Sequence, residues 1–296
     1  MTAGRAVTVV ETGPLATVQD AGRPGQAALG IGRSGVCDRT SYRLANRLVG
    51  NEAGAAVLEV TFGGLVLRAE TDVVIATTGA RCPGGPHNAP ERLAASQQLR
   101  LGPPVTGLRT YLAVRGGIAV APVLGSRSTD LLAGLGPAVL SPGTRLPVGE
   151  PTGPMPGVDV AAVADPTAGD LVVHLLPGPR RDWFDDTAWT ELLGQEYAAS
   201  NDSNRIGVRL EGRPLERTRT GELPSEGMVR GALQVPQSGS PVLFLADHPV
   251  TGGYPVVGYV HDDDVDRCGQ LRPGQAVRFT ASHEAVDRRA GRSSAG

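Results

Sequence analysis

The sequence contains no lysine: all 28 of its basic residues are arginine. Lysine carries biotin in biotin-dependent enzymes, forms Schiff bases with carbonyl substrates and pyridoxal, and reaches the phosphates in a P-loop. The chain therefore cannot hold biotin or pyridoxal covalently, and it has no P-loop of its own. If ATP or biotin takes part in its reaction, the anchoring lysine belongs to a partner.

Cysteine and long apolar runs are also scarce. The three cysteines, Cys37, Cys82 and Cys268, are far apart and form no Cys-x-x-Cys pair, so we expect buried, inert thiols and no zinc or redox site. No run approaches the roughly 18 apolar residues of a membrane span, and the first residues lack the apolar stretch of a secretory signal. We therefore expect a cytoplasmic protein that does not bind a membrane.

Neither sign of charge dominates. The chain has 30 acidic and 28 basic residues and a formal net charge of −2. Nucleic-acid binding requires a basic surface that neutralises phosphates. The composition therefore predicts no nucleic-acid partner.

The common catalytic motifs are missing. The sequence has no Gly-x-Ser-x-Gly elbow, no His-Glu-x-x-His pair and no Walker A segment, and its five histidines lack the spacing of metal ligands. The run from His261 to Asp266 holds four carboxylates, and we interpret it as a solvated helix N-terminus and not as a cation site. Residues 30–35 match the dinucleotide fingerprint Gly-x-Gly-x-x-Gly, but their approach is rich in turn residues, which favours a glycine-rich loop before a capped helix.

What the chain does contain is a series of short β-type segments. They are rich in Val, Leu, Ile and Thr, and many of the 41 glycines and 24 prolines separate them. Such spacing predicts a mostly β protein built from barrels or sandwiches, with a hairpin turn at residues 237–240. The clearest segments are residues 7–10, 57–62, 73–77, 111–114, 171–176, 242–245, 256–260 and 277–280.

Helical periodicity is confined to a few places. Asp38 is a plausible N-cap for a helix over residues 39–49, and Gly50 can end that helix in the left-handed conformation. We predict a second helix over residues 182–197 and a short third helix that starts within residues 262–264 and ends near Gly269.

A proline-rich segment marks the predicted domain boundary. We expect a β-rich N-terminal domain over residues 1–141 and a linker over residues 142–169, where proline and glycine give way to alanine. A C-terminal domain over residues 170–282 and a flexible polar tail over residues 283–296 complete the prediction.

The most chemically loaded stretch runs from Asp247 to Pro255. Asp247 and His248 are followed by Thr251, two glycines and Tyr254, so a strand end presents a carboxylate, an imidazole, a hydroxyl and bare backbone amides together. Glycine permits close approach of the backbone to a ligand. The local pattern leaves two interpretations open, a functional site and a plain hairpin whose glycines supply positive φ.

Several short motifs occur together in one order over residues 7–279: residues 13–20 with 22–25, Asp38 with 44–51, 125–129, 203–207 with 209–212, 225–227, 234–236, 251–255 and 270–274. In this respect the chain resembles the KipA-like family. That family comprises the C subunit of bacterial ATP-dependent 5-oxoprolinase and is also labelled biotin-dependent carboxyltransferase or allophanate hydrolase subunit 2.

The resemblance implies a fold and partners. It implies two β-rich domains of cyclophilin-like barrel type with a few short helices. It also implies a KipI-like B subunit as partner, together with a separate A subunit of 5-oxoprolinase. The expected reaction is the ATP-dependent opening of the 5-oxoproline lactam, a small cyclic amide, to glutamate. No cofactor is expected to be covalently bound to this chain; ATP would be used by the complex, and biotin is possible only on a partner.

The motifs supply the candidate site residues. As catalytic residues we expect Asp247, Glu226 and Ser225, with Asp247 or Glu226 as general base. An arginine would hold the substrate carboxylate bidentately, and the amides near two glycines would stabilise an oxyanion. His248 receives no catalytic role from the resemblance, and no metal is expected. The substrate-binding candidates are Asn204, Arg205, Gln234, Thr251, Gly252, Gly253 and Tyr254, assisted by Arg127 and Ser128.

Two other functions fit the same motifs. One is a biotin-dependent carboxyltransferase subunit that acts on urea or a similar amide. The other is a regulatory protein that binds a KipI-like inhibitor of a histidine kinase. Both need the same partner surface, so the sequence leaves them open.

Overall fold

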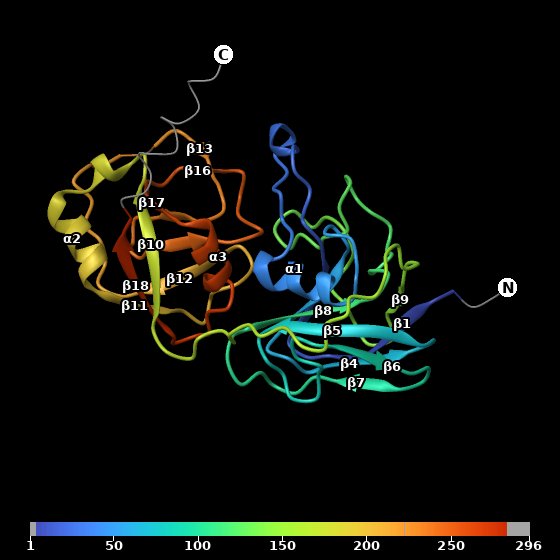
Figure 1. Ribbon diagram of the computed structural model, residues 1–296. Coiled ribbons are helices and arrows are strands. Elements are labelled where there is room, and N and C mark those ends of the chain that lie inside the picture. The colour runs from blue at the N-terminus through green and yellow to red at the C-terminus, as the bar shows by residue number, and fades with distance from the viewer. Residues whose placement is uncertain (1–3, 222, 283–296) are drawn as a thin grey trace, which may run out of the picture. The chain divides into compact units, whose positions relative to one another are not determined.

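The computed structural model describes residues 4–221 and 223–282 (Figure 1). The chain folds into two compact units, which we describe separately. Unit 1 comprises Met1–Ala168 with Gly269–Arg272, and unit 2 comprises Gly169–Cys268 with Pro273–Gly296. The predicted tail at residues 283–296, which includes His283, lies outside the described residues.

Unit 1 is built on two antiparallel sheets (Figure 1). One has the order β7-β4-β1-β9, with β1 at Ala6–Thr12, β4 at Leu65–Ala69, β7 at Gln98–Arg100 and β9 at Arg145–Pro147. The other has the order β2-β3-β8-β5-β6, with β2 at Leu15–Gln19, β3 at Val57–Thr61, β5 at Val73–Gly79, β6 at Pro90–Leu93 and β8 at Arg109–Val114. Their alternating apolar side chains form one buried cluster that includes Val9, Val60, Leu67 and Leu112.

Helix α1 (Arg39–Leu48) covers the other face of the five-stranded sheet. Its apolar face, with Tyr42 and Ala45, packs against Tyr111 and Ala113 of β8. Every residue of β8 is therefore buried, because one face meets the inter-sheet core and the other meets the helix. The Asp38 side chain accepts a hydrogen bond from the Ser41 amide at 2.9 Å, which confirms the predicted N-cap.

The segment predicted as a linker contributes a strand to unit 1. Residues 145–147 form β9, which pairs with β1 through Val7 opposite Leu146. A Pro- and Gly-rich composition is compatible with a short edge strand. The linker prediction at residues 142–169 therefore begins too early.

The motif at residues 270–274 has a structural explanation. The Gln270 side chain accepts hydrogen bonds from the amides of Leu108 and Arg109 at 3.0 and 2.9 Å, and it donates to Asp38 Oδ2 at 2.8 Å. The Arg272 guanidinium donates to the Gly107 carbonyl at 2.6 Å. These buried bonds explain why Gly269–Arg272 belongs to unit 1.

Unit 2 is a closed barrel with the strand order β10-β17-β14-β15-β12-β11-β18 (Figure 1). Only the β10–β18 pair is parallel; the other pairs are antiparallel. Closure removes exposed strand edges. The strands are β10 at Leu171–Pro177, β11 at Glu196–Ala199, β12 at Gly207–Glu211, β14 at Ala232–Gln234, β15 at Val242–Phe244, β17 at Val256–Val260 and β18 at Ala276–Ala281.

The helices of unit 2 are short. The second predicted helix is interrupted: it comprises the 3-10 turn η2 (Arg181–Trp183) and α2 (Asp186–Gly194), and the chain then enters β11. The helix ends earlier than predicted because Tyr197 is fully buried as a barrel residue. The third helix, α3, spans Asp262–Cys268 as predicted. Its Asp264 and Asp266 are buried, which corrects the prediction of a solvated run.

The mostly β prediction with a few short helices is confirmed. The hairpin at residues 237–240 joins β14 and β15, which pair with Leu233 opposite Leu243. Residues 30–35 form a loop before α1, and η1 (Ala27–Leu29), not a strand, precedes them. This arrangement agrees with the interpretation as a glycine-rich loop before a capped helix.

Candidate functional site

A two-stranded ribbon in unit 2 brings several predicted residues together. Strand β13 (Glu226–Gly227) pairs antiparallel with β16 (Thr251–Gly252), so that Glu226 lies opposite Gly252. The Met228 amide extends the pairing by donating to the Val250 carbonyl at 2.8 Å. The ribbon thus joins the two sequence motifs that contain Ser225 and Thr251.

Glu226 is held by an arginine that no sequence motif indicates. Arg180 Nε donates to both carboxylate oxygens, at 2.8 and 3.1 Å, and its Nη2 also donates to Oε1. The hydrogen bonds from Arg180 lower the pKa of Glu226, so the carboxylate is ionised at neutral pH. Its side chain is 25% exposed and can therefore still accept a hydrogen bond from a ligand.

Gln234 fixes the chain next to the ribbon. Its Nε2 donates to the Tyr254 carbonyl at 3.1 Å and lies 3.7 Å from the Met228 sulfur. A Cβ at Gly252 would lie 2.7 Å from this same Nε2, so a larger residue would displace the amide. The Tyr254 side chain is 44% exposed. A side chain at position 252 would therefore require the Gln234 amide to move.

Arg205 and Asp247 form a buried ion pair. Arg205 Nε and Nη2 donate to the two Asp247 oxygens, both at 2.9 Å, and the side chains are 1% and 0% exposed. The sequence predicts Arg205 as a substrate-binding residue and Asp247 as one of two candidates for the general base. In the structure the two groups bind each other, Arg205 just before β12 and Asp247 just after β15, which is the geometry of a buried ion pair.

The remaining candidates of unit 2 lie on the surface. Asn204 Oδ1 accepts a hydrogen bond from the Ile206 amide at 2.8 Å and so closes a turn. Ser225, Thr251 and Gly253 are exposed on or beside the ribbon. Ser225 and Gly253 are therefore placed where they can contact a ligand, whereas the Asn204 oxygen serves the backbone.

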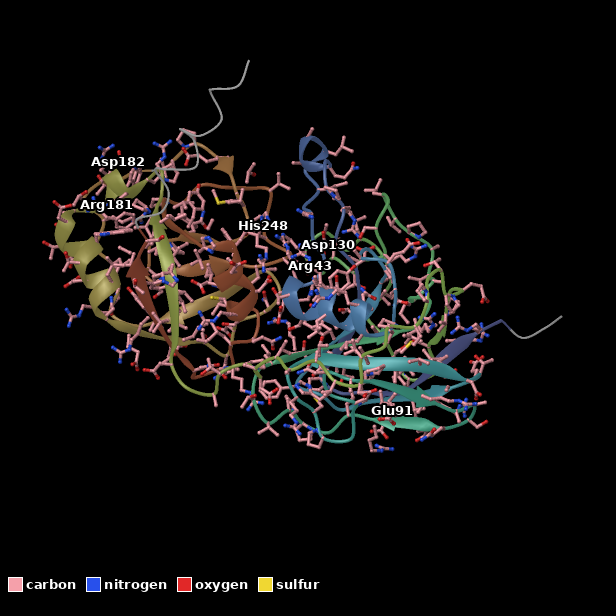
Figure 2. All side chains as sticks on the ribbon, in the orientation of Figure 1. Arg43, Glu91, Asp130, Arg181, Asp182 and His248 are labelled. Atoms are coloured by element: carbon pink, nitrogen blue, oxygen red, sulfur yellow. The ribbon has the colours of Figure 1, made fainter. Side chains whose placement is uncertain are left out.

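The His248 side chain contacts Pro249 and Phe244. Its Nδ1 lies 2.8 Å from the Pro249 carbonyl and its ring is tilted against Phe244, with centroids 6.4 Å apart. Figure 2 shows the side chain on the segment that follows β15. Because a carbonyl oxygen only accepts hydrogen bonds, Nδ1 carries the hydrogen in this contact.

Arg127 and Ser128 belong to unit 1. The Ser128 hydroxyl donates to Asp20 Oδ1 at 2.7 Å and accepts from the Asp20 amide at 2.9 Å. Arg127 Nε donates to the Val120 carbonyl at 2.7 Å, and its amide donates to Asp20 Oδ2 at 2.6 Å. The structure therefore joins the motifs at residues 13–20 and 125–129 in one hydrogen-bond network. Within this network the Ser128 hydroxyl both donates and accepts a hydrogen bond.

Arg180 and Tyr259 are functional candidates that sequence reasoning missed. Burial, and then the charge of Glu226, raises the pKa of Tyr259, which places this ring near the carboxylate. Arg180 precedes Glu226 by 46 residues. No local motif surrounds either residue, so only the paired fold could have indicated them.

The described residues contain no cluster of three or more His, Cys, Asp or Glu side chains that could hold a metal ion. Two carboxylates of α3 are paired with residues outside the helix: Asp264 accepts from the His174 amide, and Asp266 accepts from Arg230. None of the helices in residues 4–221 and 223–282 is both long and apolar enough for a membrane span.

Known proteins resemble this chain along most of its length. The C subunit of 5-oxoprolinase from Escherichia coli K12 is 38% identical over 280 residues, which cover 92% of this chain and 89% of the relative. The crystal structure of TTHA0988 is 36% identical with a TM-score of 0.84, and the match covers 95% of this chain and 56% of that one. The Kluyveromyces lactis urea carboxylase structure is 28% identical with a TM-score of 0.86, covering 95% of this chain and 28% of that one.

A family model supports the same assignment. The model described as "Carboxyltransferase domain, subdomain A and B" matches residues 29–281, which include the whole barrel, the β13–β16 ribbon and α1. Together with the 38% identity to the E. coli relative, this match establishes the family. The chain belongs to the carboxyltransferase domain family, subdomains A and B.

Proposed function

We propose that this chain is the C subunit of a 5-oxoprolinase complex, which opens the lactam of 5-oxoproline to glutamate in an ATP-dependent reaction. The observation that carries the proposal is the 38% identity to the C subunit of the E. coli 5-oxoprolinase, over 89% of that protein's length. A second relative of the same name, from Haemophilus influenzae, is 30% identical over 91% of its length.

The absence of lysine supports different roles for the subunits of the complex. A subunit without lysine supplies neither a Walker lysine nor a biotin attachment point. ATP handling therefore falls to the partners, a KipI-like B subunit and an A subunit. This chain would contribute substrate contacts and act only within the complex.

The ribbon offers a chemical role for Glu226. Lactam opening adds water to the amide carbonyl, breaks the C–N bond and transfers a proton to the leaving nitrogen. An ionised carboxylate held by Arg180 accepts a hydrogen bond from the attacking water or from the lactam N–H. The exposed Ser225 precedes Glu226 in the sequence. The exposed Gly253 follows Gly252, which lies opposite Glu226 in the ribbon.

The test is glutamate formation by the reconstituted complex of A, B and C subunits supplied with 5-oxoproline and ATP. Glu226→Gln keeps the shape but removes the charge, and we expect kcat to fall about a hundredfold. Glu211→Gln, at an exposed position on β12, is the matched control and should keep wild-type turnover. Equal turnover of wild type and Glu226→Gln would remove Glu226 from the mechanism, and a complete complex that forms no glutamate would reject the function.

Carboxyl transfer to urea is the second candidate. The family description and the similarity to the K. lactis urea carboxylase structure favour it. In this reaction a carboxyl group passes from carboxybiotin on a partner to a urea nitrogen, and a proton leaves that nitrogen. Urea-dependent ATP hydrolysis with a biotinylated partner and bicarbonate would support this candidate, and a silent assay would reject it.

A further inference from the structure

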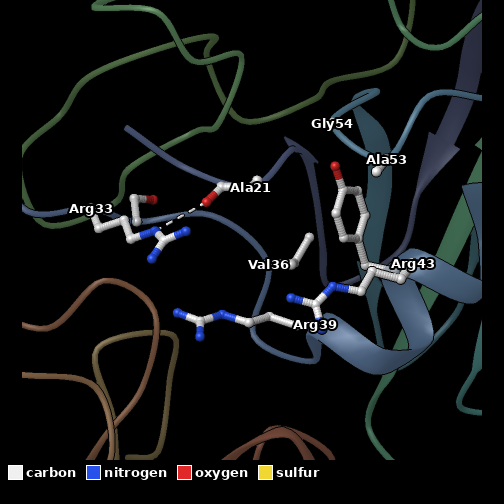
Figure 3. A pocket seen from close by; sticks show the side chains of 9 residues that line it. Ala21, Arg33, Val36, Arg39, Arg43, Ala53 and Gly54 are labelled. Carbon is white, nitrogen blue, oxygen red and sulfur yellow. Dashed lines mark hydrogen bonds between the residues drawn. The ribbon is translucent and has the colours of Figure 1, made fainter. Parts of the chain in front are cut away.

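Unit 1 contains a pocket whose lining residues all belong to that unit. Its volume is about 300 Å³, and Figure 3 shows the nine side chains that line it. Three of the nine are arginines and none is acidic. The lining residues are Ala21, Arg33, Ser34, Val36, Arg39, Tyr42, Arg43, Ala53 and Gly54.

The three arginines come from two neighbouring elements. Arg33 lies on the glycine-rich loop before α1, where its Nε donates to the Ala21 carbonyl at 3.3 Å. Arg39 and Arg43 are one helical turn apart on α1 and so share a face of the helix. Arg43 is exposed, and within residues 4–221 and 223–282 it has no hydrogen-bond or ion-pair partner. The pocket therefore brings three guanidinium groups together, and none of its lining residues is acidic.

Tyr42 provides an independent indication of a ligand. The residue is 2% exposed, and its hydroxyl has no hydrogen-bond partner in the described part of the chain. A buried hydroxyl without a partner is costly, so such groups are rare unless a ligand or water satisfies them. Tyr42 lines the pocket together with Ala53 and Gly54, which Figure 3 labels.

Tyr42 also has the protonation state of a donor. Burial, followed by the charge of Asp20, raises the pKa of Tyr42, so the phenol stays neutral at physiological pH. Asp20 itself is occupied, because its carboxylate accepts hydrogen bonds from two serine hydroxyls and two backbone amides. The neutral phenol therefore keeps its hydroxyl hydrogen and can donate a hydrogen bond to an anion.

We propose that this pocket binds a small oxyanion, a carboxylate or a phosphate, between the guanidinium groups of Arg33, Arg39 and Arg43, with the Tyr42 hydroxyl as an additional donor. Planar guanidinium groups match the paired oxygens of both anions. A volume near 300 Å³ lies at the small end of ligand pockets, which favours a compact anion over a nucleotide. The inference does not depend on the proposed 5-oxoprolinase function.

Isothermal titration of the full-length chain at low ionic strength tests the proposal, with inorganic phosphate in one arm and 5-oxoproline in the other. We expect saturable binding of at least one anion, weaker at higher salt, and the arm that responds identifies the source of the oxyanion. Arg43→Gln should weaken it about tenfold or more. Arg47→Gln removes the same charge from an exposed position one turn further along α1, outside the pocket, and should change the affinity by no more than about twofold.

Tyr42→Phe separates ligand binding from folding. The free variant should be at least as heat-stable as wild type, because it removes only an unpaired buried hydroxyl, while its anion affinity should fall. Unchanged affinity in Tyr42→Phe contradicts the role of the hydroxyl. Absence of saturable binding in both arms, or equal affinity of wild type and Arg43→Gln, overturns the proposal.

Discussion

The buried Arg205–Asp247 pair allows a sharp stability prediction. The side chains are 1% and 0% exposed and share two hydrogen bonds of 2.9 Å. Arg205→Ala would leave the buried Asp247 carboxylate without its guanidinium partner. Breaking a buried pair from one side costs about 3–5 kcal/mol, so we expect unit 2 to lose that much free energy of unfolding. Asp247→Ala should cost a similar amount.

Urea unfolding followed by tryptophan fluorescence measures this loss directly. Both tryptophans of the chain, Trp183 and Trp189, lie in unit 2, so their emission reports on the barrel. The double variant Arg205→Met with Asp247→Leu removes both charges together and should be more stable than either single variant, because no charge is left unpaired.

An exposed pair provides the control. Asp182 pairs with Arg219 at 2.9 Å, with side chains 47% and 56% exposed, and Figure 2 shows Asp182 at the edge of unit 2. Asp182→Ala should cost at most about 1 kcal/mol. Single variants at Arg205 or Asp247 that lose less than this control would refute the structural role. So would a double variant whose loss equals the sum of the two single losses.

Three further predictions follow from buried groups. All three thiols are buried and burial raises the pKa of Cys268 to about 12, so Ellman's reagent should label none until the chain unfolds; rapid labelling of the native protein would contradict this. Desolvation raises the pKa of Asp264, but hydrogen bonds led by those from His174 outweigh it and leave the pKa below 3.8. The ionised carboxylate therefore stabilises the fold above pH 3.8, and this stabilisation is lost as the pH falls through the lower pKa of the folded state. Asp264→Asn should make the free energy of unfolding depend less on pH in this acid range. An unchanged pH dependence would refute the role of Asp264. Gln270→Ala should cost about 2–4 kcal/mol and speed hydrogen exchange at the Leu108 amide, whereas unaltered exchange would show that this bond is dispensable.

Local sequence signals predicted the elements that depend on neighbouring residues. The Asp38 cap fixes the start of α1, and the turn at residues 237–240 fixes the hairpin between β14 and β15. Both rely on interactions within a few residues, which composition and spacing reveal. The predicted helix over residues 182–197 ran too far because barrel closure places Tyr197 in a strand.

The candidate site was harder to predict because its contacts are long-range. Arg180 and Glu226 are 46 residues apart, and neither stands in a motif that names the other. Asp247 and Arg205 do lie in recognised motifs, and there the two buried side chains pair with each other. A structural ion pair and a catalytic pair have the same residue types, so the sequence alone does not distinguish them.

The pocket on unit 1 shows a further limit of sequence reasoning. Residues 30–35 matched a nucleotide fingerprint by letter, yet no strand leads into them. The loop instead places Arg33 and Ser34 beside α1, where the helix supplies two more arginines. The guanidinium groups of Arg33, Arg39 and Arg43 line one pocket only because the folded unit packs the loop beside the helix.

The proposed 5-oxoprolinase function is tested most directly by supplying 5-oxoproline or urea, in parallel, to the A and B subunits with and without this chain. We expect ATP-dependent glutamate formation from 5-oxoproline only when this chain is present, and no consumption of urea. Glutamate formation that proceeds equally without this chain, or turnover of urea in place of 5-oxoproline, would contradict the proposed function.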